Sequence, residues 1–164
     1  MISIRPMESA DWQDVADIYA QGIATGIATF ETSVPSYEDW DNNHLTSCRL
    51  VASAGGQLAG WAALSPVSGR CVYGGVAEVS VYVSPDFHGK GIGKLLLNQL
   101  ILDSEAEGLW TLQSGIFPEN AASIRLHEAC GFRKIGYREK VAKRDGHWKD
   151  NLIFERRSTV VGQD

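Results

Sequence analysis

Residues Val76–Lys94 read VAEVSVYVSPDFHGKGIGK, a strand pattern that passes through a glycine-rich turn into a helix. In its first part, Val79, Val81 and Val83 alternate with polar residues, which is the period of a strand with one buried face. Directly after it, the leucine-rich run Leu95–Leu102 predicts a buried helix, and Gly108 is a suitable C-cap. The best strand and the best helix of the chain therefore meet at one turn.

Shorter patterns on both sides extend this unit. They predict strands at Ile2–Arg5, Arg49–Ala54, Gln57–Leu64, Thr111–Phe117, Lys134–Val141 and Asn151–Arg156, and helices over Trp12–Ile23, from Ser36, and over Asn120–Cys130. Gly55-Gly56 and Asp145-Gly146 are typical of tight hairpin turns. Helices interspersed with hairpins indicate an α/β (α+β) fold, a mixed sheet flanked by helices. No linker divides residues 1–164, so we expect a single domain, with a frayed tail at 158–164.

Composition excludes several classes of protein. The chain has 164 residues, 15 Lys+Arg and 20 Asp+Glu, for a formal net charge of −5, which disfavours a nucleic-acid or anionic-membrane partner. No apolar run is long enough for a membrane span, and the N-terminus lacks a signal peptide's apolar core. The three cysteines are widely spaced, without metal-ligand spacing. We therefore expect a cytoplasmic protein with reduced thiols and no metal.

The glycine-rich turn has the features of a phosphate site. Gly89, Gly91 and Gly93 allow the backbone N–H groups to approach a ligand closely. The following helix directs its positive end into the same turn, and Lys90 and Lys94 add charge. Neither a mononucleotide P-loop nor a Rossmann fingerprint is present. The alternative interpretation is a solvated glycine-rich connection.

A second motif lies in the helix predicted over Asn120–Cys130. Ser123 and His127 follow Asn120 by 3 and 7 residues, so at ~100° per residue the three share one stripe of the helix. A stripe of this kind is often only a solvated surface, and a single helical histidine is often structural.

Together the two motifs resemble those of the Gcn5-related N-acetyltransferase (GNAT) superfamily. There, (Gln/Arg)-x-x-Gly-x-(Gly/Ala) after a strand cradles the pyrophosphate of coenzyme A. The corresponding residues are His88, Gly89, Lys90, Gly91, Ile92, Gly93 and Lys94, with His88 departing from the usual Gln or Arg. The resemblance also implies that Asn120 binds the pantetheine or a neighbouring amide, that Ser123 lies near the phosphate arm, and that His127 lies beside the sulfur.

The resemblance is closer to the phosphinothricin and methionine-sulfoximine N-acetyltransferase group. Matching pieces are Thr29–Thr32, Val76–Ser84, Pro118–Phe132 and Gly146–Asp150, the last following a Gly-x-Trp-x-Asp pattern. It implies a homodimer that moves acetyl from acetyl-CoA to the α-amine of a small amino acid such as phosphinothricin, methionine sulfone or methionine sulfoximine. It further implies that Val81, Tyr82 and Val83 form a splayed strand whose backbone N–H groups face the acetyl carbonyl, and that Phe30, Glu31, Arg70, Val72 and Tyr73 line the substrate pocket.

The chemistry of the reaction gives candidate roles to Glu78, His127 and Arg70. An ammonium group must lose a proton before it attacks a thioester, and Glu78, which interrupts an apolar strand, is the candidate base if partial burial raises its pKa. The alternative is a charge on an edge strand facing water. His127 is either a proton donor to the leaving thiolate or a structural residue. Arg70 is the candidate partner of a substrate carboxylate.

Two alternative functions remain open at this level. The acceptor is another amine in one of them, such as a protein N-terminus, a polyamine or an aminoglycoside. Glu31, Glu38, Asp39 and Asp41 could then supply an acidic cleft. In the second, the chain is a non-catalytic regulator that only binds acyl-CoA.

Overall fold

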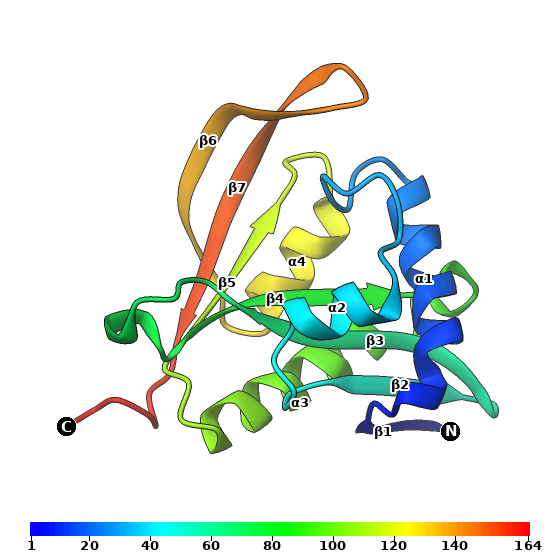
Figure 1. Ribbon diagram of the computed structural model, residues 1–164, viewed down its shortest axis with the longest axis horizontal. Helices are drawn as coiled ribbons and strands as arrows, with labels where there is room; N and C mark the ends of the chain where they lie inside the picture. The colour runs from blue at the N-terminus through cyan, green and yellow to red at the C-terminus, as the bar shows by residue number, and fades with distance from the viewer.

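The computed structural model describes all of residues 1–164 and contains one seven-stranded sheet (Figure 1). Its strand order is β1-β2-β3-β4-β5-β7-β6, and only the β4–β5 pair is parallel. The strands are β1 (Ile2–Pro6), β2 (Leu50–Ala54), β3 (Gln57–Pro66), β4 (Val76–Val83), β5 (Thr111–Ile116), β6 (Arg133–Arg144) and β7 (His147–Arg157). The helices are α1 (Trp12–Ala24), α2 (Tyr37–Asn43), α3 (Ile92–Ala106) and α4 (Ala121–Ala129), with short 3-10 turns at Ser9–Asp11, Cys71–Tyr73 and Pro85–Phe87. The mixed sheet flanked by helices is confirmed.

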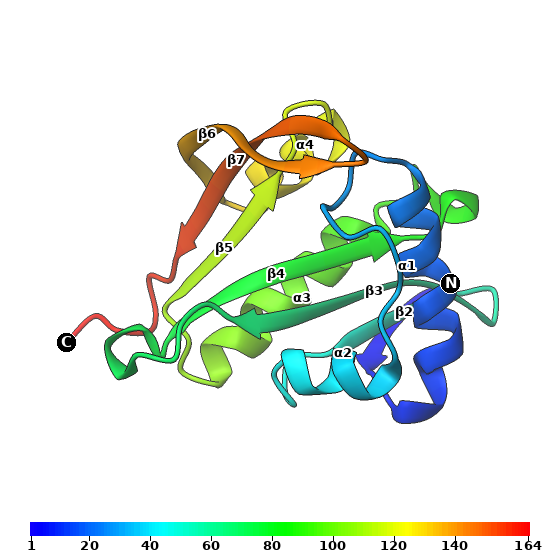
Figure 2. The same cartoon turned by 45° about the horizontal axis from the view of Figure 1, so that its top comes forward.

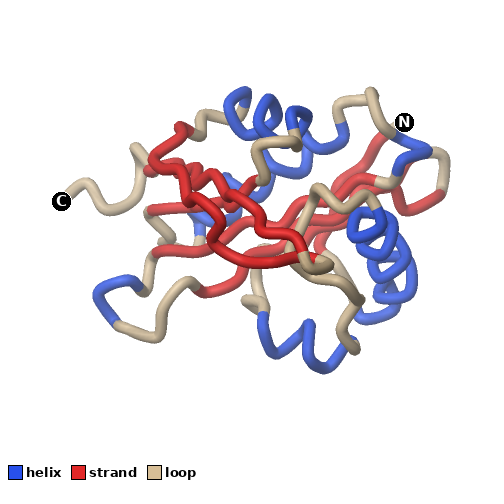
Figure 3. Tube along the Cα trace, turned by 90° about the horizontal axis from the view of Figure 1, so that it is seen from above, coloured by secondary structure: helices blue, strands red, loops and turns tan.

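Helices cover both faces of the sheet, as Figure 3 shows from above. On one face, α3 packs against β1 to β4, and its buried leucines belong to the larger of two apolar clusters. On the other face, α1 and α2 enclose a smaller cluster that includes Trp40 and Trp61. Two-sided coverage explains why β3 is buried along most of its length.

Strand β4 lies inside the sheet, between β3 and β5, so Glu78 is not on an edge strand, although its side chain is exposed as that alternative expected. Its residues alternate as the sequence predicts: Val79, Val81 and Val83 pack on the α3 face, whereas Tyr82 packs on the α1 face. The strand thus presents apolar side chains to the core and its polar set, including Glu78, to the opposite side.

The sheet opens between β4 and β5. Their parallel pairing consists of three residue pairs, from Val76↔Thr111 to Glu78↔Gln113. Beyond these pairs, β4 continues to Val83 and β5 to Ile116 without further pairing, and Figure 2 shows the two strands diverging. This divergence creates an opening in the sheet that is lined by residues of both strands.

The C-terminal hairpin is longer than the sequence pattern predicts, because β6 and β7 continue to the Asp145-Gly146 turn. Lys140 has a φ of 44°, and the register shifts between Arg138 and Ala142. Asp150 holds this irregularity by accepting a hydrogen bond from the Lys140 backbone N–H at 2.7 Å. Such bulges bend a strand, and the hairpin curves over the top of the molecule (Figure 1).

The tail corrects one expectation, because Ser158–Gly162 is tied down rather than frayed. Ser158 is buried, and its hydroxyl donates to Glu105 Oε2 at 2.6 Å and accepts from two backbone N–H groups of the tail. Arg157 donates to the carbonyls of Val161 and Gly162. These bonds could not be read from the polar composition of the tail.

None of the helices has the length and apolar composition that crossing a membrane requires.

Candidate active site

The opening between β4 and β5 holds a cleft of about 740 Å³. Its walls come from the end of α1, the segment after α1, β4, the glycine-rich turn, β5, the start of α4 and one residue of β7. The cleft brings together most of the residues expected from the sequence: Phe30, Glu78, Val81, Tyr82, Val83, His88, Gly89, Gly91, Ile92, Gly93, Lys94, Asn120, Ser123 and His127.

The glycine-rich turn has the geometry of an anion site. Gly89 and Gly91 have φ values of 78° and 77°, in the left-handed region that side chains other than glycine rarely adopt. Gly91 is the N-cap of the 15-residue helix α3, so the unpaired N–H groups and positive end of that helix face the turn. A Cβ added at Gly89 or Gly91 would meet no atom within 4 Å, which leaves the approach to these N–H groups open.

Helix α4 borders the same cleft because Gly93 allows it to pack closely on α3. A Cβ at Gly93 would lie only 3.2 Å from Leu126 Cδ2. Asn120 is the N-cap of α4, and its Oδ1 accepts the Ser123 backbone N–H at 3.2 Å. The amide oxygen is therefore engaged in the cap, and the amide nitrogen is the group that Asn120 can offer to a ligand.

His127 is buried, and its two ring nitrogens differ in their surroundings. Nδ1 lies 2.8 Å from the Ser123 carbonyl oxygen, which can only accept, so Nδ1 carries the proton in this neutral ring. Nε2 is buried without a hydrogen-bond partner. Burial lowers the pKa of His127 below its ordinary value, although the bond to Ser123 opposes the shift. At neutral pH the residue is thus a neutral imidazole with an unused acceptor.

Strand β4 offers backbone groups to the cleft. The Ser84 N–H donates to the Ala59 carbonyl next to β3, at 2.8 Å. By the alternation of an antiparallel pair, the N–H groups of Val81 and Val83 point away from β3, into the opening. The Val83 carbonyl on that side accepts from His88 Nε2 at 3.0 Å, so the side chain that departs from the superfamily motif folds back onto the strand.

The side chains of Glu78 and Tyr82 project from the face of β4 opposite to Val79, Val81 and Val83. Glu78 is exposed, which corrects the expected partial burial; its Oε1 lies 3.5 Å from Gln113 Nε2. The Tyr82 ring stacks on Trp61, with centroids 5.0 Å apart, and burial raises the pKa of its phenol. A Cβ at Gly22 of α1 would lie 2.6 Å from the Tyr82 ring, so this glycine makes room for the aromatic side chain.

Five expected site residues do not line the cleft. Lys90 is exposed on the turn, and Glu31 lies just beyond the lining residues of its segment. Arg70, Val72 and Tyr73 precede β4, at the end of that strand opposite to the glycine-rich turn. Val72 and Tyr73 border a separate hollow beside Trp110. These three residues therefore do not line the cleft within a single chain.

Asn151 lines the cleft, and the sequence pattern did not single it out. A Cβ at Gly115 of β5 would lie 2.7 Å from Asn151 Nδ2, so the carboxamide occupies the space above that glycine. Gly115 is on the same face of β5 as Gln113, the partner of Glu78, because strand residues two apart share a face. Asn151 makes no side-chain hydrogen bond within the chain. Only the pairing of β5 with β7 could have indicated the position of Asn151, and the pattern of one strand does not reveal its pairing partner.

The cleft fits an acyl-CoA as co-substrate. Its turn end offers glycine N–H groups, the positive end of α3 and Lys94 to a pyrophosphate, and Val81 and Asn120 offer N–H groups further along. From Val83 to Glu78 the strand runs five residues, ~17 Å at ~3.3 Å per residue, so an extended arm can lie along β4 with its end near Glu78. No group of three or more His, Cys, Asp or Glu side chains is placed to hold a metal ion.

Comparison with known proteins agrees with this geometry. The profile of the Acetyltransferase (GNAT) family matches residues 12–132. The phosphinothricin N-acetyltransferase of Alcaligenes faecalis is 32% identical, over 94% of this chain and 81% of its own. The L-methionine sulfoximine/L-methionine sulfone acetyltransferase of Pseudomonas aeruginosa is 35% identical, over 93% of this chain and 92% of its own.

A solved structure matches the fold throughout. The GNAT superfamily phosphinothricin acetyltransferase of Sinorhizobium meliloti, in complex with acetyl-CoA, superposes with a TM-score of 0.88 at 28% identity, covering 99% of this chain and 91% of that one. The matched profile spans both the glycine-rich turn and helix α4. The chain therefore belongs to the GNAT acetyltransferase family and is an acetyl-CoA-dependent N-acetyltransferase.

Proposed function

We propose that the protein acetylates the α-amine of a small amino acid such as methionine sulfoximine, methionine sulfone or phosphinothricin, with Glu78 as the general base. The observation that carries this proposal is the position of Glu78, on β4 at the point where β5 diverges from that strand, facing the part of the cleft remote from the phosphate turn. The activities that the relatives' names state support the substrate class.

In the proposed reaction, Glu78 takes a proton from the acceptor's ammonium group, directly or through a water molecule, and the free amine attacks the thioester carbonyl. The Val81 N–H then donates to the oxyanion of the tetrahedral intermediate. Collapse of the intermediate breaks the carbon–sulfur bond, and the remaining excess proton on the attacking nitrogen passes to the leaving sulfur, directly or through water. The products are the acetylated amine and the free thiol. In this scheme the Glu78 carboxylate serves the amine and the Val81 N–H serves the oxyanion, and both groups belong to β4.

We do not assign the general-acid role to His127 in this scheme. With Nδ1–H donated to Ser123, its Nε2 has a lone pair and no proton to give. A buried acceptor without a partner is unfavourable, and an amide N–H of the bound co-substrate would satisfy it. His127 is thus proposed to accept a hydrogen bond from the pantetheine arm.

One structural observation favours small amino acids over polyamines and aminoglycosides as acceptors. Glu78 is the only acidic residue among those that line the cleft. Glu31, Glu38, Asp39 and Asp41 lie outside it, so the acidic cleft expected for a polycationic acceptor is not formed. We further propose a cytoplasmic homodimer, which the three free cysteines and the exposed apolar side chains of Val72 and Tyr73 support.

Thiol release from acetyl-CoA with a panel of amines tests the proposal. We expect turnover with methionine sulfone, methionine sulfoximine or phosphinothricin, and little with spermidine, an aminoglycoside or a peptide with a free N-terminus. Turnover confined to the last three amines would contradict the substrate class.

A further inference from the structure

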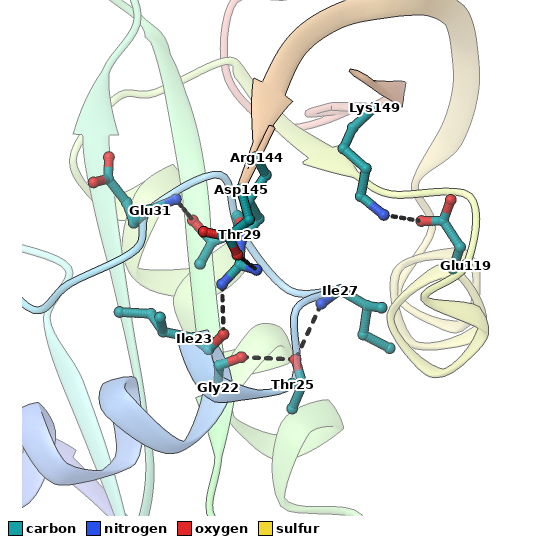
Figure 4. A network of polar contacts seen from close by, with 10 residues as sticks. All are labelled: Gly22, Ile23, Thr25, Ile27, Thr29, Glu31, Glu119, Arg144, Asp145 and Lys149. Carbon is teal, nitrogen blue, oxygen red and sulfur yellow. Dashed lines mark hydrogen bonds and ion pairs between the residues drawn. The ribbon is translucent and has the colours of Figure 1, made fainter. Parts of the chain in front are cut away.

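The tip of the C-terminal hairpin is bonded to the segment that follows α1. Arg144, the last residue of β6, has a side chain only 11% exposed. Its Nε donates to the Thr29 carbonyl at 3.0 Å and its Nη2 to the Ile23 carbonyl at 2.8 Å, while Nη1 pairs with Asp145 at 3.0 Å (Figure 4). The two carbonyls belong to residues more than one hundred positions earlier in the chain.

The segment held in this way forms one wall of the cleft. Residues 27–30 line it, and the Phe30 ring packs edge-on against Phe117 of the opposite wall, with centroids 4.7 Å apart. Between Ile27 and Pro35, the other hydrogen bonds of the backbone are local, to the hydroxyls of Thr25 and Thr29. The bond from Arg144 is the one that joins the backbone of this segment to another element.

Arginine suits this position for two physical reasons. Its planar fork donates in several fixed directions at once, whereas a lysine ammonium is a single point charge on a flexible stem. Ile23 lies in the last turn of α1, where the helix dipole favours a cation, and its carbonyl accepts from Arg144 in addition to the Gly26 backbone N–H. Arg144 therefore both caps α1 and fixes the segment that starts there.

We propose that Arg144 is a positioning residue for the acceptor side of the cleft, which is the part remote from the phosphate turn where the amine would meet Glu78. Acting through Thr29, it holds Phe30 against Phe117 and thereby sets the shape of the wall that the amine meets. The expected effect on KM for the amine rests on the proposed amine acetylation, whereas the fixing of residues 27–30 by Arg144 does not. The phosphate turn lies on other elements, so binding of acetyl-CoA does not depend on this contact.

The test compares Arg144→Ala with Arg144→Lys and with Arg138→Ala, an exposed arginine of the same strand that makes no bond to the segment. We expect Arg144→Ala to raise KM for the amine about tenfold, equivalent to ~1.4 kcal/mol, while KM for acetyl-CoA stays within about twofold. Arg144→Lys should fall between, because a single ammonium group replaces the planar fork that bonds the two carbonyls, and Arg138→Ala should match the unmodified protein.

Amide hydrogen exchange, measured with acetyl-CoA and no amine present, supplies an independent readout. Exchange at residues 27–31 should accelerate in Arg144→Ala and not in Arg138→Ala. Unchanged exchange, or equal increases in both KM values, would overturn the inference. If no amine is turned over by the unmodified protein, the proposed function fails while the exchange data still decide the role of Arg144. If Arg144→Ala does not fold, Arg144→Lys is measured in the same way.

Discussion

Gly91 is the position at which a single substitution tests the phosphate turn. Its φ of 77° and the absence of any atom within 4 Å of an added Cβ mean that Gly91→Asp introduces backbone strain without a clash. The strain costs ~1–2 kcal/mol of folding free energy. The added carboxylate would stand where we propose that the pyrophosphate binds.

The effect on binding follows from the charge. At ~4 Å and an effective dielectric constant of ~20, repulsion between a carboxylate and one phosphate charge is ~4 kcal/mol, and solvent at this exposed turn reduces it toward ~2 kcal/mol. Because ~1.4 kcal/mol is tenfold, the Kd for coenzyme A should rise between about 30-fold and about 1,000-fold.

Gly108→Asp provides the matched control. Gly108 follows the other end of α3, has a φ of 81°, and likewise has no atom within 4 Å of an added Cβ. This variant should lose at least as much thermal stability as Gly91→Asp, and its Kd for coenzyme A should not change. Calorimetric titration with coenzyme A and thermal unfolding of both variants make the comparison. Binding by Gly91→Asp within threefold of the unmodified protein would refute the placement of the pyrophosphate.

Three further predictions concern the rest of the cleft. Asn151→Ala should raise KM for the amine severalfold and leave KM for acetyl-CoA unchanged in initial-rate assays, because its unpartnered carboxamide faces the acceptor side; equal effects on both would refute this. Gly22→Ala should lower the free energy of unfolding by ~1–3 kcal/mol in urea titrations, because its Cβ would overlap the Tyr82 ring; an unchanged midpoint would show that the ring moves freely. Stability should fall as pH drops below about 6.5, because burial lowers the pKa of His44 and His127 in the folded chain, so the unfolded chain binds protons first. Urea unfolding of His127→Gln at pH 7.5 and 5.5 should show a smaller difference than the unmodified protein.

Local patterns predicted much of this molecule. The alternation of Val79, Val81 and Val83, the glycines before α3 and the stripe from Asn120 to His127 each depend on neighbours within a few residues, and the structure places all of them as expected. A cleft lined by one strand, one turn and one helix can therefore be predicted from a single sequence.

The acceptor side was less accessible to sequence reasoning because it is assembled from distant segments. The exposure of Glu78 depends on where β5 leaves β4, and Asn151 reaches the cleft only because Gly115 lies beneath it. Arg144 meets Thr29 only because the hairpin bends near Lys140. No periodic pattern in the sequence indicates these contacts between distant residues. Closeness in sequence can also mislead, because Arg70 lies only a few residues before β4 and yet does not line the cleft.

The most direct test of the account is the rate of Glu78→Gln with methionine sulfone at saturating acetyl-CoA. The isosteric amide cannot take a proton, so kcat should fall by about 10²–10⁴-fold, while the Kd for coenzyme A stays unchanged and the deficit narrows as pH rises toward the pKa of the acceptor amine. A kcat within threefold of the unmodified protein across that pH range would contradict the assignment of Glu78 as the base.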